Sequence, residues 1–447
     1  MASDGISRRH FFFGSLLTGA LPAGGFGSAA SLRRLGYKSP NERLNVAGIG
    51  AGGKGYSDLA GCDTENIVAL ADPDDKQARR AFEKYPRAAK YKDFRQMLDR
   101  EGRNVDAVIV STPDHMHGAA SMWAMERGKH VYCQKPLTRT IWEARQLAKG
   151  AAKYRVATQM GNQGYSNEGT RQCAEMIWAG DIGAVTEVHA WTNRPIWPQG
   201  LLAQPKEEPV PETMDWNTWI GVGREHAYSS EIAPFKWRGY YDYGCGALGD
   251  MACHILGAPN MALMLGAPTS VECIKQEGTS EFTFPKNSVI RFDFPARGSM
   301  PPVKIFWYDG LKEVPAIEGV PPGELLGDRG NNGSLFVGEN GMITTGCYGE
   351  RTRLVPASRM QDYRLPPPFL TRSPGHYRDW IRACKGGAPA CSDFSIAGPF
   401  TEWILLGVLA LRFPGKLEWD SAKMRVTNIK EANRHIKPKL RKGWKFA

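Results

Sequence analysis

A glycine-rich stretch near the start of the chain has the spacing of a loop that binds phosphate groups. Gly48, Gly50 and Gly53 are spaced Gly-x-Gly-x-x-Gly and follow the stretch RLNVA. The first glycine allows a tight turn, the second lets the backbone approach a pyrophosphate, and the third lets a helix pack closely on a strand. The amino end of that helix offers unpaired N–H groups and a partial positive charge. The alternative is a turn without a ligand, because the chain contains 50 glycines.

Asp72 supports the ligand-binding interpretation of this loop. It ends a second apolar stretch, NIVALADPD, and follows Gly50 by 22 residues. A carboxylate at this place accepts hydrogen bonds from ribose hydroxyls and repels a 2′-phosphate. The loop and Asp72 together predict a site for NAD rather than NADP.

A second set of reactive side chains lies in the other half of the chain. Asp250 and His254 are four residues apart, so on a helix they share one face. A carboxylate placed in this way fixes the tautomer of an imidazole and raises its basicity, which makes His254 a candidate general base. The same spacing also describes an Asp–His pair with a purely structural role.

Two further histidines, His115 and His117, are close enough in sequence to suggest a metal site. We find no third or fourth ligand at a useful spacing and therefore expect no metal. We expect His117 to shape the cofactor pocket instead.

The elements that must position these residues follow two different patterns. From residue 43 to 165, expected strands (43–50, 66–74 and 105–115) alternate with expected helices (75–86, 93–102 and 140–154). This order predicts a Rossmann domain, which is a doubly wound parallel sheet. From 166 to 427, strands separated by turns and two closing helices predict an α/β domain with an open, mainly antiparallel sheet. We expect residues 428–447 to form a basic, loosely held tail.

The formal net charge of +11 belongs mainly to the ends of the chain. Residues 1–40 carry a net +4 and residues 428–447 a net +6, which leaves +1 for the body between them. A nucleic-acid groove requires basic residues on the fold itself, so we expect no nucleic-acid partner.

Residues 1–30 have the features of an export signal. Arg8-Arg9 precede Phe11-Phe12 and an apolar run, and small residues follow at 27–30. This pattern resembles a twin-arginine signal, which directs folded proteins to the periplasm or the outside of the cell. The alternative to cleavage is a membrane anchor, but the apolar run is short for that purpose.

The nine cysteines include no Cys-x-x-Cys pair. Cys384 and Cys391 are close enough in sequence to form a disulfide in an oxidising compartment. Mostly free, buried thiols are the alternative that we favour, because a protein exported in the folded state folds in the reducing cytoplasm.

Three motifs in order resemble those of the glucose–fructose oxidoreductase, inositol dehydrogenase and rhizopine-catabolism family, Gfo/Idh/MocA. They are STPDHMH at 111–117, KHVYCQKPL at 129–137 and GDMACH at 249–254. The resemblance covers about residues 43–425. It implies a Rossmann domain, a nicotinamide at the junction with a C-terminal α/β domain, and sugars or cyclitols as substrates. It also implies a homo-oligomer, a dimer or tetramer, assembled through the C-terminal sheet.

The family's catalytic Lys, Asp and His correspond to Lys135, Asp250 and His254. Two positions depart from the family pattern: the usual Glu-Lys-Pro is Gln134-Lys-Pro here, and the usual Asp-x-Gly-x-His has lost its glycine. In hydride removal from an alcohol, His254 would act as the base and Lys135 would stabilise developing alkoxide charge. The further residues expected at the cofactor are Thr112, Pro113, His117, Gln134, Lys135 and Asn162. Asn162 and its neighbour Gln163 end an expected strand, and their alternative role is that of turn residues without a ligand.

Aromatic and basic side chains concentrate between residues 191 and 243. Aromatic faces stack on sugar C–H surfaces, and Arg and Lys donate to hydroxyls. We expect Trp191, Arg194, Trp237 and Tyr241 to contact the substrate, while the core and a subunit interface account for most of the other aromatic residues.

The export signal constrains the chemistry, because no NAD pool exists outside the cytoplasm. The NAD must therefore be tightly bound before export, and each cycle must return the hydride. Three functions meet this condition in different ways. They are a sugar oxidoreductase with a second carbonyl substrate, a redox-neutral glycoside hydrolase working by transient C3 oxidation and elimination, and a non-catalytic sugar-binding protein.

Overall fold

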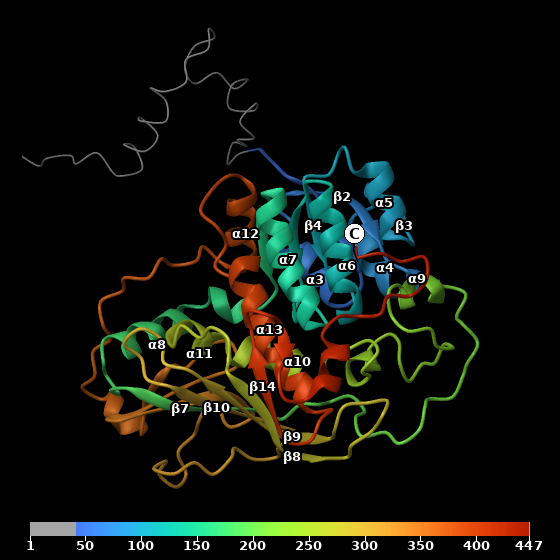
Figure 1. Ribbon diagram of the computed structural model, residues 1–447. Helices are drawn as coiled ribbons and strands as arrows, with labels where there is room; N and C mark the ends of the chain where they lie inside the picture. The colour runs from blue at the N-terminus through green and yellow to red at the C-terminus, as the bar shows by residue number, and fades with distance from the viewer. Residues whose placement is uncertain (1–41, 447) are drawn as a thin grey trace, which may run out of the picture.

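The computed structural model describes residues 42–446, in which two sheets form separate layers (Figure 1). The export signal predicted at 1–30 lies outside the described residues. Within 42–446, no helix combines the length and the apolar character that a membrane crossing requires.

The first sheet is parallel and has the strand order β3-β2-β1-β4-β5-β6. Its strands are β1 (Asn45–Ile49), β2 (Asn66–Ala71), β3 (Ala89–Tyr91), β4 (Ala107–Val110), β5 (His130–Cys133) and β6 (Thr158–Met160). The connecting helices are α3 (Lys54–Gly61), α4 (Asp75–Lys84), α5 (Phe94–Glu101), α6 (Asp114–Glu126) and α7 (Ile141–Tyr154). The order reverses between β1 and β4, so a crevice for ligands opens beyond the carboxyl ends of these strands.

Local sequence explains where several of these helices begin. Asp74 and Asp93 cap α4 and α5 by accepting hydrogen bonds from backbone N–H groups of the first turn. Thr140 and Glu143 form a reciprocal capping box at the start of α7. These caps satisfy N–H groups that would otherwise lack partners.

The second sheet has nine strands in the order β13-β12-β11-β7-β10-β9-β8-β14-β15. The strands are β7 (Val185–Thr192), β8 (Ser270–Glu277), β9 (Asn287–Phe294), β10 (Val303–Asp309), β11 (Asn332–Gly338), β12 (Gly341–Thr345), β13 (Arg353–Val355), β14 (Lys416–Asp420) and β15 (Arg425–Val426). All pairings are antiparallel except that of β7 with β10. The two sheets confirm the predicted fold class.

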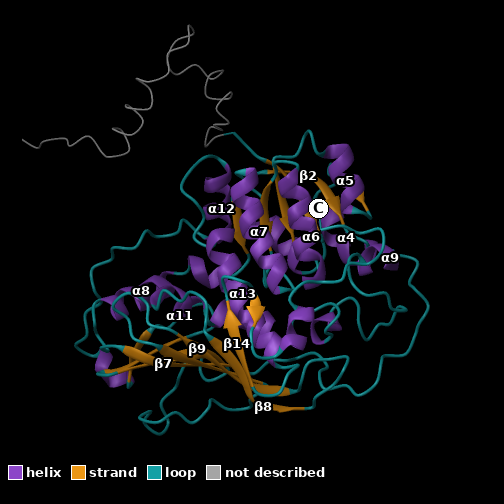
Figure 2. Ribbon diagram, in the orientation of Figure 1, coloured by secondary structure: helices purple, strands orange, loops and turns teal. Residues whose placement is uncertain are grey.

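Helices cover one face of the second sheet, between it and the first domain (Figure 2). They are α8 (Glu168–Trp178), α10 (Gly246–Ile255), α11 (Gly257–Ala262) and α13 (Phe394–Ala410). Phe292 of β9 packs against Trp403 of α13 with their ring centroids 5.2 Å apart. Partly buried and fully buried side chains alternate along β9, so one face of the sheet is buried and the other faces outward.

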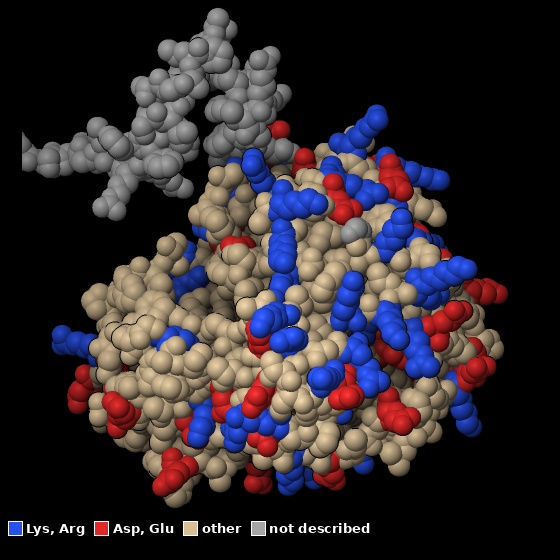
Figure 3. Space-filling view, viewed as in Figure 1, with Lys and Arg blue, Asp and Glu red and all other residues tan. Residues whose placement is uncertain are grey.

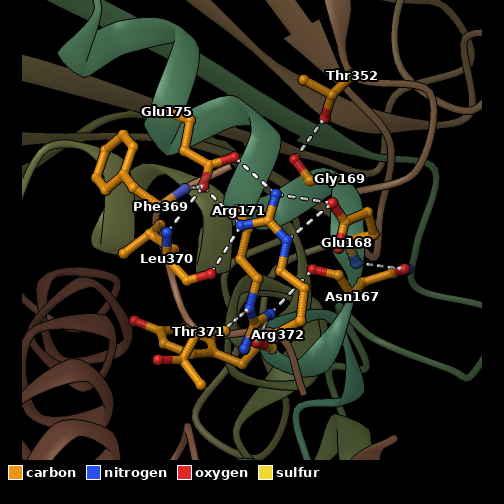
Figure 4. A network of polar contacts seen from close by, with 11 residues as sticks. Asn167, Glu168, Gly169, Arg171, Glu175, Thr352, Phe369, Leu370, Thr371 and Arg372 are labelled. Carbon is orange, nitrogen blue, oxygen red and sulfur yellow. Dashed lines mark hydrogen bonds and ion pairs between the residues drawn. The ribbon is translucent and has the colours of Figure 1, made fainter. Parts of the chain in front are cut away.

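One late helix, α12 (His376–Cys384), packs against the first sheet rather than the second. Trp380 and Ile381 of α12 share a core with Leu59 and Cys62. The preceding segment, residues 361–375, is held along α8. Figure 4 shows the Glu175 carboxylate accepting from Arg372 and from the backbone N–H groups of Phe369 and Leu370.

The basic segment 428–446 differs from the loosely held tail that we expected. Trp444 is buried, and its ring packs near Phe94 and under the Arg95 guanidinium. The seven Lys and Arg residues of this segment led us to expect a solvated tail, and local sequence does not show that Trp444 meets a distant partner. On the face shown in Figure 3, basic side chains are interspersed with acidic ones.

All nine cysteines are free, and seven of them are buried, in agreement with the alternative that we favoured. Cys384 and Cys391 therefore form no disulfide.

Candidate active site

A cavity of about 640 Å³ lies at the junction of the two domains. Its walls come from the glycine loop, from the ends of β2, β4 and β5, and from α10 and the connection between β7 and α10. Residues 42–446 contain no group of three or more His, Cys, Asp or Glu side chains that suits a metal ion.

The glycines of the loop have different roles. Gly50 has φ +80°, and a Cβ there would lie 2.6 Å from the Ser111 carbonyl oxygen, so only glycine fits. Gly53 also has a positive φ, +50°, and both residues line the cavity. Gly48 lies beneath the loop in β1 and does not line the cavity, contrary to our expectation, because it packs against the Leu59 and Leu70 side chains.

We expected Gly53 to allow close packing of the helix on the strand, but Gly55 has this role. A Cβ on Gly55 would lie 1.8 Å from the Gly50 carbonyl oxygen, whereas a Cβ on Gly53 would meet nothing within 4 Å. Gly53 is needed for its backbone conformation at the start of α3.

Asp72 lies at the cavity, but its carboxylate already has backbone partners. Oδ2 accepts from the N–H groups of Ala51 and Gly52 at 2.9 and 3.1 Å, and Oδ1 accepts from the N–H of Asp74 at 2.9 Å. Burial raises the pKa of Asp72 to about 6. The side chain thus holds the glycine loop in shape, and its expected contact with a ribose remains a prediction.

An ion pair between Lys135 and Asp250 bridges the two domains. Lys135 Nζ lies 2.9 Å from Asp250 Oδ1 and donates to the Asp250 carbonyl oxygen at 2.8 Å. Arg238 Nε lies 3.5 Å from the same carboxylate oxygen. Burial disfavours the ionised carboxylate, but the charges of Lys135 and Arg238 outweigh it and lower the pKa of Asp250.

His254 lies in the same cavity, but, contrary to our expectation, no hydrogen bond among the described residues links it to Asp250. The carboxylate faces Lys135 and Arg238 instead, because a cation competes better for it than a neutral imidazole. His254 Nδ1 is buried and has no partner, and the ring packs edge-on against Tyr348 at 4.7 Å. Burial, together with the charge of Lys135, holds the pKa of His254 well below its usual range. The imidazole is therefore neutral.

Gln134 faces a buried carboxylate that the sequence analysis missed. Its Nε2 donates to both carboxylate oxygens of Asp58, at 2.9 and 3.1 Å. Asp58 is fully buried and also accepts from Ser111 Oγ and the Tyr377 hydroxyl, both at 2.7 Å, and pairs with Lys54. A glutamate at position 134 would place a second carboxylate against Asp58, which explains the departure from Glu-Lys-Pro.

Several buried polar atoms in or beside the cavity wall have no hydrogen-bond partner among residues 42–446. Thr112 Oγ1 is one of them, and Asn162 is fully buried with both side-chain polar atoms unpaired. Thr112 and its neighbour Pro113 line the cavity, as do Gly161 and Gln163 on either side of Asn162. Buried polar groups normally have hydrogen-bond partners, so these atoms fit a ligand with its own donors and acceptors.

His117 connects the two turns that line this part of the cavity. Its Nδ1 lies 2.7 Å from the Pro136 carbonyl oxygen and its Nε2 lies 2.8 Å from that of Thr112. Burial lowers the pKa of His117 to about 4. His115 faces away from the cavity, with its Nε2 against the Trp219 carbonyl oxygen.

Two of the four residues expected at the substrate line the cavity, namely Arg194 and Trp237. Trp191 does not, because its ring is buried in a small separate core and Nε1 donates to the Gly330 carbonyl oxygen at 3.2 Å. Tyr241 also lies elsewhere, packed on Phe284 and under Arg412. Aromatic composition does not reveal which rings face a cavity.

The structure adds cavity residues that we did not select from the sequence. Asp114 is the first residue of α6 and is almost fully buried. Burial, reinforced by the nearby Asp250 carboxylate, raises the pKa of Asp114 to about 7. The other additions include Ile196, Trp197, Phe235, Arg238 and Tyr348.

Comparison with protein families gives two matches along the chain. Residues 44–162 match the NAD-binding Rossmann fold of the Gfo/Idh/MocA oxidoreductase family, and residues 183–276 match a C-terminal α/β domain of that family. An inositol 2-dehydrogenase from Burkholderia cenocepacia is 27% identical over 204 residues, which are 44% of this chain and 59% of the relative. The chain thus spans a little over half the length of the curated relatives that it matches.

Solved structures resemble the whole fold. The WlbA dehydrogenase from Bordetella pertussis, in complex with NADH and UDP-GlcNAcA, matches with a TM-score of 0.60 and 15% identity. The match covers 85% of this chain and 99% of that one. An inositol dehydrogenase homolog from Azotobacter vinelandii, complexed with NADH and myo-inositol, matches with a TM-score of 0.54 and 17% identity, covering 85% and 98%.

Proposed function

From the matches of residues 44–162 and 183–276 to the Gfo/Idh/MocA oxidoreductase family, we propose that this chain, as a member of that family, oxidises a hydroxyl group of a sugar or cyclitol by hydride transfer to a tightly bound NAD. The observation that carries the proposal is the shared cavity. The glycine loop, the Lys135–Asp250 ion pair and His254 all line it. The similarity to an inositol 2-dehydrogenase supports the substrate class.

The residues at the cavity fit a dinucleotide. Gly50 and Gly53 leave room for a close approach to the backbone, and Thr112 Oγ1 and the Asn162 amide lack protein partners. When bound, the dinucleotide supplies the hydride acceptor. Asp72 lines the cavity after β2, and a carboxylate after the second strand repels a 2′-phosphate, which supports NAD over NADP.

Lys135, which follows β5, and two residues of α10, Asp250 and His254, manage the hydroxyl proton and the developing alkoxide charge. His254 is neutral and accepts the hydroxyl proton, while the Lys135 ammonium stabilises the developing alkoxide. Asp250 holds Lys135 in place and, with Arg238 nearby, keeps the local charge balanced. The pair thus presents a fixed cation to the substrate rather than a mobile one.

The substrate end of the cavity has aromatic and basic walls. Trp197, Phe235 and Trp237 supply ring faces, and Arg194 supplies a donor. Phe235 is 44% exposed, so it is free to stack on a sugar ring at the cavity mouth.

A second candidate function is redox-neutral glycoside hydrolysis, and Asp114 is the observation that favours it. In this reaction a hydride leaves C3, a base removes the C2 proton, the aglycone departs with a proton, water adds and the hydride returns. The reaction needs one more acid–base group than alcohol oxidation does. Asp114, with a pKa raised to about 7, lies in the cavity with Asp250 and can exchange a proton near neutral pH.

The proposal also covers the location of the protein and its oligomeric state. The signal at 1–30 supports a periplasmic or extracellular location reached by the twin-arginine route. We also propose that the protein assembles as a homo-oligomer, a dimer or tetramer, through the second sheet.

The test uses the purified full chain without added cofactor. NAD released on denaturation is measured by mass, and turnover is then measured on inositol, free sugars and chromogenic glycosides. Sugar oxidation that needs a second carbonyl compound supports the oxidoreductase, and aglycone release without net NADH supports the hydrolase. Sugar binding without either turnover leaves the non-catalytic protein, and absence of any bound or acquired dinucleotide refutes both enzymes.

A matched pair of lysine variants tests the site itself. Lys135→Met removes the cation at Asp250, whereas Lys149→Met removes an exposed lysine of α7 away from the cavity. We expect the first variant to lose turnover while keeping bound NAD and the second to match the native protein. Full activity of Lys135→Met would refute the site.

A further inference from the structure

A part of the connection between β7 and α10 closes one end of the cavity. Residues 211–223, which we call the clasp, contain α9 (Trp216–Ile220) and belong to the second domain by sequence. They nevertheless pack on the first domain, where Figure 1 shows α9 beside α4. Met214, Thr218 and Trp219 of the clasp line the cavity.

The clasp is attached to the turn between β2 and α4. Met214 forms an antiparallel bridge with Asp74. The Asp215 N–H donates to the Pro73 carbonyl oxygen at 2.8 Å, and the Thr213 hydroxyl donates to the Asp74 carboxylate at 2.9 Å. This turn directly follows Asp72, so the attachment lies next to the carboxylate that holds the glycine loop.

A second attachment joins the other end of the clasp to α6. The Trp219 carbonyl oxygen lies 3.1 Å from His115 Nε2, and the Val222 N–H lies 3.3 Å from Met116 Sδ. Gly221 has φ +51°, and a Cβ there would lie 2.1 Å from Met116 Sδ, so the clasp and α6 are in close contact.

The end of the chain supports the clasp from behind. Arg441 donates to the Gly221 carbonyl oxygen at 3.0 Å and to Asn217 through both of its terminal nitrogens, at 2.7 and 2.8 Å. The clasp is therefore held from three sides, by the β2–α4 turn, by α6 and by the last residues of the chain.

The position of the clasp identifies the part of a ligand that it would cover. In a doubly wound sheet with a glycine loop after β1, the acidic residue after β2 faces the ribose of the adenosine half. Phe94, Met116 and Trp219 line the same cavity as Asp72 and offer the apolar surfaces that a flat purine requires. Of the two proposed catalytic residues, Lys135 follows β5 and His254 lies on α10, so neither belongs to the clasp.

We propose that the clasp forms the outer wall of an adenosine subsite and keeps the dinucleotide from exchanging with solvent. This inference rests on the proposed function, since it requires a dinucleotide in the cavity. It gives a physical reason why an exported protein retains its cofactor: the adenosine half cannot leave until attachments on three sides have opened. The clasp opens rarely, because its hydrogen bonds to the β2–α4 turn, to α6 and to Arg441 must break together.

Exchange of isotope-labelled NAD tests the clasp without measuring activity. The full chain carrying unlabelled NAD is mixed with excess labelled NAD. At intervals the protein is separated from free NAD, and the labelled fraction of the bound NAD is measured by mass spectrometry. We expect Arg441→Ala, which loses three side-chain hydrogen bonds to the clasp, to exchange at least about tenfold faster than the native protein. Arg434→Ala, on the same terminal segment but bonded only to the Glu431 carbonyl oxygen, should exchange at the native rate.

A milder variant covers the possibility that Arg441→Ala misfolds. Thr213→Val keeps the shape of the side chain but loses the hydrogen bond to Asp74, and we expect about threefold faster exchange. Native exchange rates in the folded variants would overturn the clasp while leaving the proposed function intact. A native protein that neither contains nor takes up NAD would overturn the proposed function first.

Discussion

Replacing Gln134 by glutamate restores the residue that the family resemblance leads one to expect, yet the structure predicts that it destabilises this protein. The side chain faces Asp58, which is fully buried and accepts both Gln134 hydrogen bonds. The change Gln134→Glu removes an amide donor and introduces a carboxylate in its place. No other side chain is altered, and the further hydrogen bond that the Gln134 amide donates, to the Tyr132 hydroxyl, is long at 3.4 Å, so the contact with Asp58 dominates the effect.

The size of the effect follows from the two lost hydrogen bonds, at 2.9 and 3.1 Å. A hydrogen bond to a charged group contributes roughly 1.5–3 kcal/mol, and repulsion between two buried carboxylates adds to the loss. We therefore expect the free energy of unfolding to fall by about 3 kcal/mol or more at pH 8. For a domain of this size that corresponds to a decrease in Tm of about 6 °C or more.

The effect should depend on pH in a predictable direction. Burial and the Asp58 carboxylate raise the folded-state pKa of the introduced carboxyl above its unfolded value. The variant is therefore close to the native protein below about pH 4.3, the ordinary pKa of Glu, and its deficit grows as the pH rises through the raised pKa. Thermal unfolding of both proteins from pH 4.5 to 8 measures this difference.

Gln163→Glu is the matched control for this experiment. Gln163 lines the same cavity, but its amide donates only to the Tyr377 hydroxyl, at 3.3 Å. It should show a small, nearly pH-independent change. Equal stability of Gln134→Glu and the native protein at pH 8, or a decrease no larger than that of the control, would refute the reasoning.

Three other changes have direct outcomes. Gly50→Ala should abolish NAD binding, measured as dinucleotide content, because its Cβ would lie 2.6 Å from the Ser111 carbonyl oxygen. Lys135→Met should lower kcat by roughly 10²–10⁴-fold with NAD content unchanged, and loss of NAD as well would point to a cofactor-binding role instead. If the protein is a glycosidase, the rate of aglycone release should decline as the pH rises through 7, because Asp114 loses its proton there. Asp114→Asn should remove this decline from the pH–rate profile. An unchanged pH profile would exclude Asp114 as the group that titrates.

Features that depend on neighbours in the chain were predictable from the sequence. The glycine-rich turn after β1, the strand that ends just before Asp72 and the helix that carries Asp250 and His254 all follow from local residue types and spacing. The order of these elements was sufficient to predict two domains with a parallel and a mainly antiparallel sheet.

Pairings between distant parts of the chain were decided only by the tertiary structure. Lys135, 115 residues away, takes the Asp250 carboxylate that the spacing had assigned to His254. Asp58 meets Gln134 across 76 residues, and Trp191 is buried while Trp237 reaches the cavity. Local spacing determines which side chains share a face of one element, but the contacts across a domain junction depend on how the packed elements approach, and only the folded chain contains that information.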